Sequence, residues 1–189
     1  MERTESKIKF VGLHAHSTFS VFDGLGFPDQ HMNFAYQNGC DALALTDHGN
    51  MNGLSYQVLH AKKMNSEGKK FKPIFGIEAY FIDSISNWKE EYEKHKEEKK
   101  SKGSDEESGT VVENEEETKA TEKSLLNRRA HLVLLAMNQK GLNNLFTLVS
   151  ESFKPGNFYR YPRVDFELLE KHKDRKSTHL NSSHLGISY

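Results

Sequence analysis

Two histidines at alternate positions, His14 and His16, follow the first apolar run of the chain, residues 10–13. In an extended strand, residues two apart point to the same face, so both imidazoles would project together where this strand stops. A second apolar run, residues 42–45, is followed by an acidic residue and a histidine at positions 47–48. Imidazole and carboxylate groups are natural ligands of divalent metal ions. The two strand ends therefore predict two parts of one metal site.

A carboxylate, Glu78, interrupts an otherwise apolar stretch, residues 73–82. A buried carboxylate is costly unless it is paired or bound to a metal. Glu78 could instead form a salt bridge with Lys72 or Arg129. Because other candidate ligands occur at the neighbouring strand ends, we favour the ligand role over the salt bridge. His131 opens a further apolar run. Taken alone, it is better explained by a hydrogen bond to a backbone carbonyl, and it becomes a candidate ligand only in the company of the others.

Six residues have the types and the placement that metal chemistry needs. Neutral imidazoles and carboxylates suit Zn²⁺, Mn²⁺ and Fe²⁺, and the absence of cysteine thiolates argues against a closed structural zinc site. An open, hydrolytic site fits better. We expect Asp47 to orient a histidine rather than to bind metal directly. The candidate ligands are His14, His16, Asp23, His48, Glu78 and His131.

The elements that must position these residues alternate between strand and helix, which predicts an α/β fold. Pro28 suits the first turn of a helix, and Gly39 offers it a left-handed stop. Asp165 is placed to cap a last short helix. Strands are expected over residues 7–13, 42–46, 72–82 and 131–136, and helices over residues 28–38, 53–64, 142–152 and 166–172.

Charge is distributed unevenly along the 189 residues, although the totals of 26 basic and 27 acidic residues nearly balance. Residues 83–127 hold 14 acidic and 8 basic residues and few apolar ones, which predicts an insertion that is not part of the core. Within it we expect a solvated helix over residues 88–102 and disorder over residues 103–123. Residues 175–189 show no periodic pattern of apolar residues. We therefore expect one incomplete domain over residues 1–174, followed by an unstructured and non-native tail.

Composition excludes several classes of protein. Cys40 is the sole cysteine, so a disulfide-stapled secreted scaffold is excluded and a reducing compartment is expected. The amino terminus lacks a signal-peptide core, and no run approaches the ~20 apolar residues of a membrane helix. These observations predict a soluble cytoplasmic protein without a membrane partner.

An aromatic segment, residues 158–163, contains Phe158, Tyr159 and Tyr161 beside Arg160 and Arg163. Aromatic rings and arginines could together hold single-stranded nucleic acid. Packing of this segment on its own domain is the more favoured interpretation. The two arginines are therefore only weak candidates for nucleic-acid binding.

Several of these segments resemble successive motifs of the polymerase and histidinol phosphatase (PHP) domain family. The version is similar to that at the amino terminus of bacterial replicative DNA polymerase III alpha subunits. The resemblance covers nearly everything from residue 10 to about residue 172. Its motifs lie at residues 14–20 with 23–24, 42–50, 76–80, 131–136, 141–145 and 158–165.

The resemblance implies a partial, distorted β/α barrel of the TIM-like, PHP kind, with metal at the carboxyl ends of its strands. In that family such clusters hydrolyse phosphoesters, and many alpha subunits have a metal-dependent 3′–5′ exonuclease. By motif position the same six residues would be the ligands. The family also has a cysteine ligand and, further on, a paired aspartate and histidine, which we do not find here. The chain by itself is therefore expected to be inactive.

Three functions follow as expectations. The leading one is a fragment of a replicative DNA polymerase III alpha subunit, whose parent uses Mg²⁺ for DNA synthesis. The parent's partners would be DNA, a sliding clamp and a separate proofreading exonuclease. A free-standing phosphatase, similar to a histidinol-phosphate phosphatase, is one alternative. A non-catalytic module that docks the proofreading exonuclease is the other, and the intact ligand set disfavours it.

Overall fold

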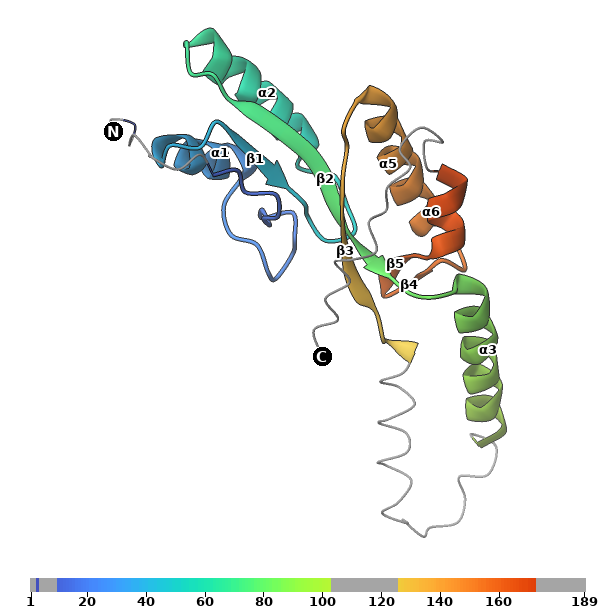
Figure 1. Ribbon diagram of the computed structural model, residues 1–189. Coiled ribbons are helices and arrows are strands. Elements are labelled where there is room, and N and C mark those ends of the chain that lie inside the picture. Colours follow the sequence, from blue (N-terminus) through green and yellow to red (C-terminus); the bar gives the residue numbers. More distant parts are fainter. Residues whose placement is uncertain (1–2, 4–9, 103–125, 173–189) are drawn as a thin grey trace.

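The structure is a computed structural model that describes residues 3, 10–102 and 126–172 (Figure 1). The segments expected to be disordered (103–123) and non-native (175–189) lie outside these residues. A five-stranded mixed sheet carries the helices. The elements are α1 (Pro28–Gln37), β1 (Ala42–Leu45), α2 (Leu54–Ser66), β2 (Lys72–Phe81), α3 (Ile85–Lys102), β3 (Ala130–Leu135), α5 (Gln139–Ser152), β4 (Phe158–Tyr159), β5 (Tyr161–Val164) and α6 (Phe166–His172).

Strand β2 is the centre of the sheet. Its first half pairs in parallel with β1, from Lys72 to Phe75, and its second half pairs antiparallel with β3. Tyr80 and Phe81 also pair in parallel with β5. The predicted α/β alternation is confirmed. Within the described residues the sheet is open, and β3 runs against its neighbour because a long excursion through α3 returns the chain to the far end of β2.

The first predicted strand is largely missing from the described residues. Its residues 7–9 lie outside them. What remains is a single parallel bridge between Gly12 and Leu43, in which the amide of Ala44 donates to the Gly12 carbonyl at 2.8 Å. Residues 13–26 form a loop instead, so the two histidines of the first motif are placed by a loop that lies against β1.

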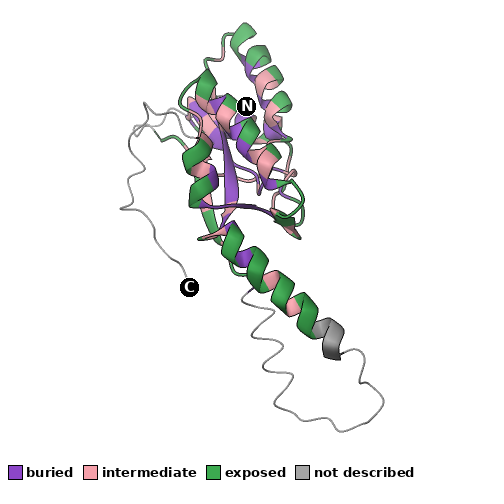
Figure 2. Cartoon of the chain, turned by 90° about the vertical axis from the view of Figure 1, so that its right-hand side faces the viewer, coloured by how far each residue is buried: buried purple, intermediate pink, exposed green. Residues whose placement is uncertain are grey.

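Two hydrophobic cores flank the sheet (Figure 2). Helices α1 and α2 bury one set of side chains beside β1, and α5 and α6 bury another against β2 and β5. In α2, Gln57, Ala61 and Met64 are buried, whereas Leu54 and Val58 are only partly so. The two cores consist of Met32, Ala35, Ala61, Met64 and Phe71, and of Ile77, Ala79, Ile85, Leu145, Leu148, Val164 and Leu168.

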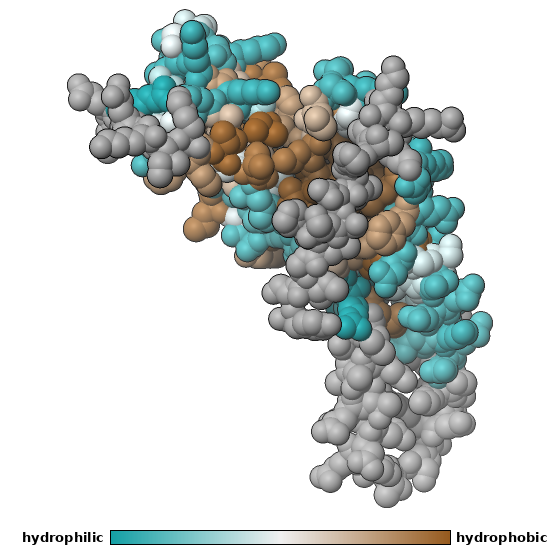
Figure 3. Space-filling model, viewed as in Figure 1, coloured by the Kyte–Doolittle hydropathy of each residue, from teal (hydrophilic) through white to brown (hydrophobic). Residues whose placement is uncertain are grey.

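Helix α3 begins inside the core, which corrects the prediction of a wholly solvated insertion. Ile85 and Trp88 are buried, and the Trp88 indole donates a hydrogen bond to the Leu126 carbonyl at 2.9 Å. Beyond this first turn the helix leaves the body of the protein and is covered mostly by hydrophilic residues (Figure 3). No helix among the described residues is long and apolar enough to cross a membrane.

Asp165 caps α6 as predicted, and it also fixes α3. One carboxylate oxygen accepts from the Leu168 amide at 2.9 Å, and the other accepts from the Ile85 amide at 2.8 Å. Both donors belong to the first turns of helices, whose free amides carry partial positive charge. One buried carboxylate therefore joins the starts of two helices.

We expect Asp165→Ala to lower the free energy of unfolding by about 2 kcal/mol, because it removes a helix cap and leaves a buried amide without an acceptor. Asp165→Asn keeps one acceptor oxygen and should lose about half as much. Urea unfolding followed by circular dichroism measures both values. Equal stability of Asp165→Ala and the wild type would contradict this role.

Candidate metal centre

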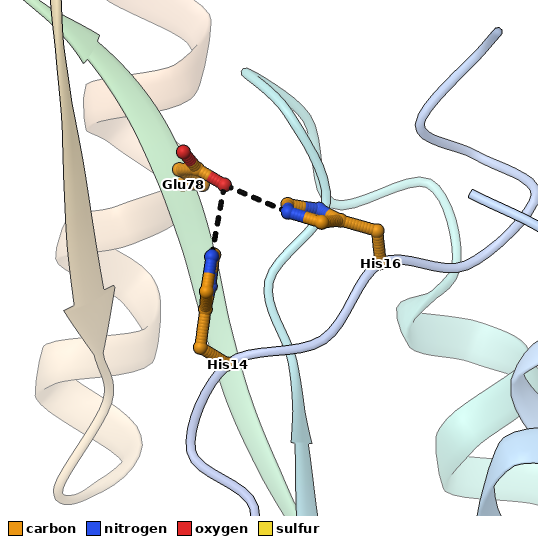
Figure 4. A group of neighbouring side chains, drawn as sticks. All are labelled: His14, His16 and Glu78. Carbon is orange, nitrogen blue, oxygen red and sulfur yellow. Dashed lines mark ion pairs between the residues drawn. The ribbon is translucent and has the colours of Figure 1, made fainter. Parts of the chain in front are cut away.

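Four imidazoles surround the carboxylate of Glu78, which is 3% exposed in the middle of β2. Its Oε2 atom lies 3.3 Å from Nε2 of His14 and 2.9 Å from Nε2 of His16 (Figure 4). Nδ1 of His48 is 3.4 Å from the same oxygen, and Nδ1 of His131 contacts Oε1. The carboxylate thus joins the loop of residues 13–26, the end of β1 and the start of β3.

A hydrogen-bond network holds His16 in place. The buried carboxylate of Asp47 accepts from the Ser17 amide at 2.7 Å, the Ser17 hydroxyl at 2.8 Å and the Ser20 hydroxyl at 2.7 Å. Since the Ser20 hydrogen goes to Asp47, its oxygen can only accept. Oγ of Ser20 accepts a hydrogen bond from the His48 amide at 3.1 Å, and Nδ1 of His16 lies 3.3 Å from the same oxygen.

This network determines which nitrogen of His16 carries hydrogen. With Nδ1–H donating to Ser20, Nε2 presents a lone pair to Glu78. Burial lowers the pKa of His16, and the neighbouring charge of His48 lowers it further, so the neutral ring is favoured. A lone pair and a carboxylate oxygen then face each other at 2.9 Å with no hydrogen between them. A cation would relieve this arrangement.

Two further contacts orient the imidazoles of His14 and His48 through the ring nitrogens that do not face Glu78. Nδ1 of His14 lies 2.7 Å from the Thr46 hydroxyl, and Nε2 of His48 lies 2.6 Å from a carboxylate oxygen of Asp23. The hydrogen bond from His48 holds the pKa of Asp23 below its usual value. Nδ1 of His48 and Oε2 of Glu78 are buried atoms without a hydrogen-bond partner. Buried polar atoms of this kind require an explanation, and a divalent cation supplies one.

The six predicted ligands form three overlapping triads, in each of which the possible ligand atoms lie within 4.8 Å of one another. His16, His48 and Glu78 each belong to two triads, so each of them could contact more than one cation. The structure thus brings all six residues together, while their binding of metal stays a prediction. The triads are His14, His16 and Glu78; His16, Asp23 and His48; and His48, Glu78 and His131.

The alternatives to these ligand roles are not found. Glu78 makes no ion pair with Lys72 or Arg129 among the described residues. The Arg129 guanidinium lies over the Tyr161 ring instead. His131 meets the Glu78 carboxylate rather than a backbone carbonyl.

Sequence reasoning missed three hydroxyl residues that hold the imidazoles: Ser17, Ser20 and Thr46. Their signal in the sequence is weak, because serine and threonine are common in loops. Only their position between candidate ligands sets them apart.

Arg163 does not face solvent, which corrects its candidacy for nucleic-acid binding. It is 1% exposed, lies 4.0 Å over the Trp88 ring, and donates to the carbonyls of Tyr159 and Tyr161 at 2.7 and 3.2 Å. Burial lowers its pKa to about 10, so it stays protonated at neutral pH. Arg160 is exposed at the turn between β4 and β5, and its binding of nucleic acid stays a prediction.

The chain is thus an α/β protein whose loops and strands gather four imidazoles around a buried carboxylate. The chain belongs to the PHP domain family, whose model matches residues 12–186. That match runs past residue 174, so the predicted domain boundary stays a prediction.

The chain is similar to the DNA polymerase III subunit alpha of three bacteria. It is 35% identical over 164 residues to that of Aquifex aeolicus and 33% identical over 170 residues to that of Treponema pallidum. These alignments cover 86% and 89% of this chain and 11% of each relative. The protein of Mycobacterium tuberculosis strain H37Rv is 29% identical over 174 residues, which are 92% of this chain and 13% of the relative. The chain thus spans about a tenth of the length of these relatives.

Proposed function

We propose that this chain is the PHP region of a bacterial DNA polymerase III alpha subunit, and that its cluster binds divalent cations for phosphodiester hydrolysis. The observation that carries the metal proposal is Oε2 of Glu78, a buried atom with no hydrogen bond at which three imidazole nitrogens converge. Similarity to alpha subunits supports the polymerase context. DNA synthesis by the parent in the cytoplasm, with Mg²⁺, a sliding clamp and a proofreading exonuclease, belongs to the same proposal.

The residues of the cluster have separate roles in the proposed hydrolysis. Zn²⁺, Mn²⁺ or Fe²⁺ bound here would lower the pKa of a water molecule and neutralise phosphate oxygens. Glu78 and His16 hold the closed side of the site, and Asp47 keeps His16 in the required tautomer through Ser20. The His14 and His131 side chains are about half exposed, at 46% and 47%, so a phosphodiester would approach from their side.

The proposal predicts that the chain purifies with divalent metal and that His14→Ala with His16→Ala removes most of it. Both substitutions delete nitrogens that face Glu78, and losing a ligand costs far more affinity than the 10- to 100-fold typical of outer contacts. Metal content is measured by inductively coupled plasma mass spectrometry after dialysis against Zn²⁺ or Mn²⁺.

The matched control is His31→Ala with His60→Ala, two histidines outside the cluster, which should keep the wild-type metal content. Equal metal content in both double variants would refute the ligand assignment. Bound metal without hydrolysis of a 3′-terminal phosphodiester by the parent alpha subunit would instead favour a docking module. Hydrolysis confined to small phosphate monoesters would favour a free-standing phosphatase.

A further inference from the structure

Arg129 lies at the edge of the candidate metal centre and has no acidic partner within residues 10–102 and 126–172. Its guanidinium lies 3.8 Å over the Tyr161 ring and 5.1 Å from the centre of the Tyr80 ring. One terminal nitrogen donates to the Asn127 carbonyl at 3.1 Å, and Nε has no hydrogen-bond partner. In the described part of the chain, Arg129 forms no ion pair with a carboxylate. Among the described residues, no carboxylate therefore neutralises its charge.

Tyr80 connects this guanidinium to the cluster. Its ring stacks on His48 with centres 5.8 Å apart and planes 12° apart, and it meets the ring of His131 edge-on at 5.6 Å. Tyr80 and His131 are also paired in the register of β2 and β3. Arg129 precedes His131 by two residues, so β3 delivers the ligand and the cation to the same neighbourhood. One tyrosine ring separates the guanidinium from the imidazoles.

A second guanidinium raises the positive charge here. Arg163 lies close enough that the charge of Arg129 adds to burial in lowering the pKa of Arg163. Among the described residues, Arg163 donates its hydrogen bonds to backbone carbonyls, which do not cancel its charge. Two arginines without a carboxylate between them repel each other, and an anion beside Arg129 would relieve that repulsion.

We infer that Arg129 binds a phosphate group of a nucleic-acid strand, next to the phosphodiester that lies at the cluster; this inference rests on the proposed function. A guanidinium fork matches phosphate oxygens, and the stacked tyrosines fix its orientation. Because a ring separates Arg129 from the imidazoles, it contacts a second phosphate rather than the one being hydrolysed. Arg129 thereby selects a strand over a substrate with a single phosphate.

Binding tests this assignment without any hydrolysis. We expect Arg129→Gln to weaken binding of a fluorescent single-stranded oligodeoxynucleotide about tenfold in EDTA, as measured by anisotropy. The slope of log Kd against log salt should fall by about 0.7, the value for one phosphate contact on a single strand. The control Arg128→Gln removes the same charge from the exposed neighbouring residue and should change the Kd less than twofold. Arg129→Lys keeps the charge and should restore part of the affinity.

Kinetics separate this role from the metal centre. In the proposed parent alpha subunit with Mn²⁺, Arg129→Gln should raise KM for the oligonucleotide about tenfold at unchanged kcat, and leave KM for the p-nitrophenyl ester of thymidine 5′-phosphate unchanged. Equal effects of Arg129→Gln and Arg128→Gln on oligonucleotide Kd would overturn the inference, as would equal KM changes for both substrates. If the metal proposal alone fails, hydrolysis is absent but the anisotropy difference remains. Should Arg129→Gln unfold, the folded variant Arg129→Lys is compared with Arg128→Gln instead. Equal Kd values of these two variants for the oligonucleotide would then overturn the inference.

Discussion

In the alpha subunit of which we propose this chain to be the PHP region, Glu78→Gln is expected to reduce Mn²⁺-dependent hydrolysis of a 3′-terminal phosphodiester by about 10³-fold or more. Glu78 contributes to two of the three triads, so losing its charge weakens two possible cation sites together. The new amide NH₂ would also donate toward the imidazole lone pairs of His14 or His16. Those lone pairs would then be satisfied without a cation.

The same argument predicts a gain in the absence of metal. In EDTA, Glu78→Gln should be more stable than the wild type by about 1 kcal/mol, because a buried oxygen without a hydrogen bond becomes part of a bonded amide. The control is Glu67→Gln, an exposed carboxylate paired with Lys69, which should change neither hydrolysis nor stability in EDTA. Hydrolysis by Glu78→Gln within tenfold of the wild type would show that the carboxylate is not a ligand.

The convergence of the six candidate ligands could be predicted in part from the sequence, because several of them stand at places that strand geometry marks; their binding of metal stays a prediction. His14 and His16 alternate, His48 follows an apolar run, and Glu78 interrupts one. The residues that fix their orientation could not be predicted in this way. Ser17 and Ser20 act through hydrogen bonds within the 13–26 loop and to Asp47, and such a loop has no period to reveal them.

Local sequence signals likewise predicted the start of α1 and the cap of α6. Contacts between distant residues left no comparable signal in the sequence. Pro28 begins α1 and Asp165 caps α6 because both effects depend on neighbouring residues only. The direction of β3 depends on a long connection whose composition carries no information about pairing. Arg163 resembled a surface cation in the sequence, since an arginine is rarely buried unless carbonyls from distant residues converge on it.

Those carbonyls make Arg163 the side chain whose loss should cost the most stability. Its guanidinium donates to Tyr159 and Tyr161 in the β4–β5 hairpin and, at 3.4 Å, to Leu126, and it covers the face of Trp88. One fully buried group therefore joins the hairpin to the beginning of α3 and to the chain that leads into β3. A hydrophobic side chain cannot replace it, because the Tyr159 and Tyr161 carbonyls would lose this donor.

Arg163→Ala should lower the free energy of unfolding by about 4 kcal/mol, the combined effect of a cavity and of buried carbonyls without donors. Arg163→Lys should lose about 2 kcal/mol, because one ammonium group keeps the charge but not the planar fork that reaches several acceptors. Arg160→Ala, at the exposed turn, should change stability by no more than about 0.5 kcal/mol. Urea unfolding of the three variants distinguishes these values. A loss below 1 kcal/mol for Arg163→Ala would mean that α3 and the hairpin are held by their aromatic contacts alone, with water replacing the guanidinium.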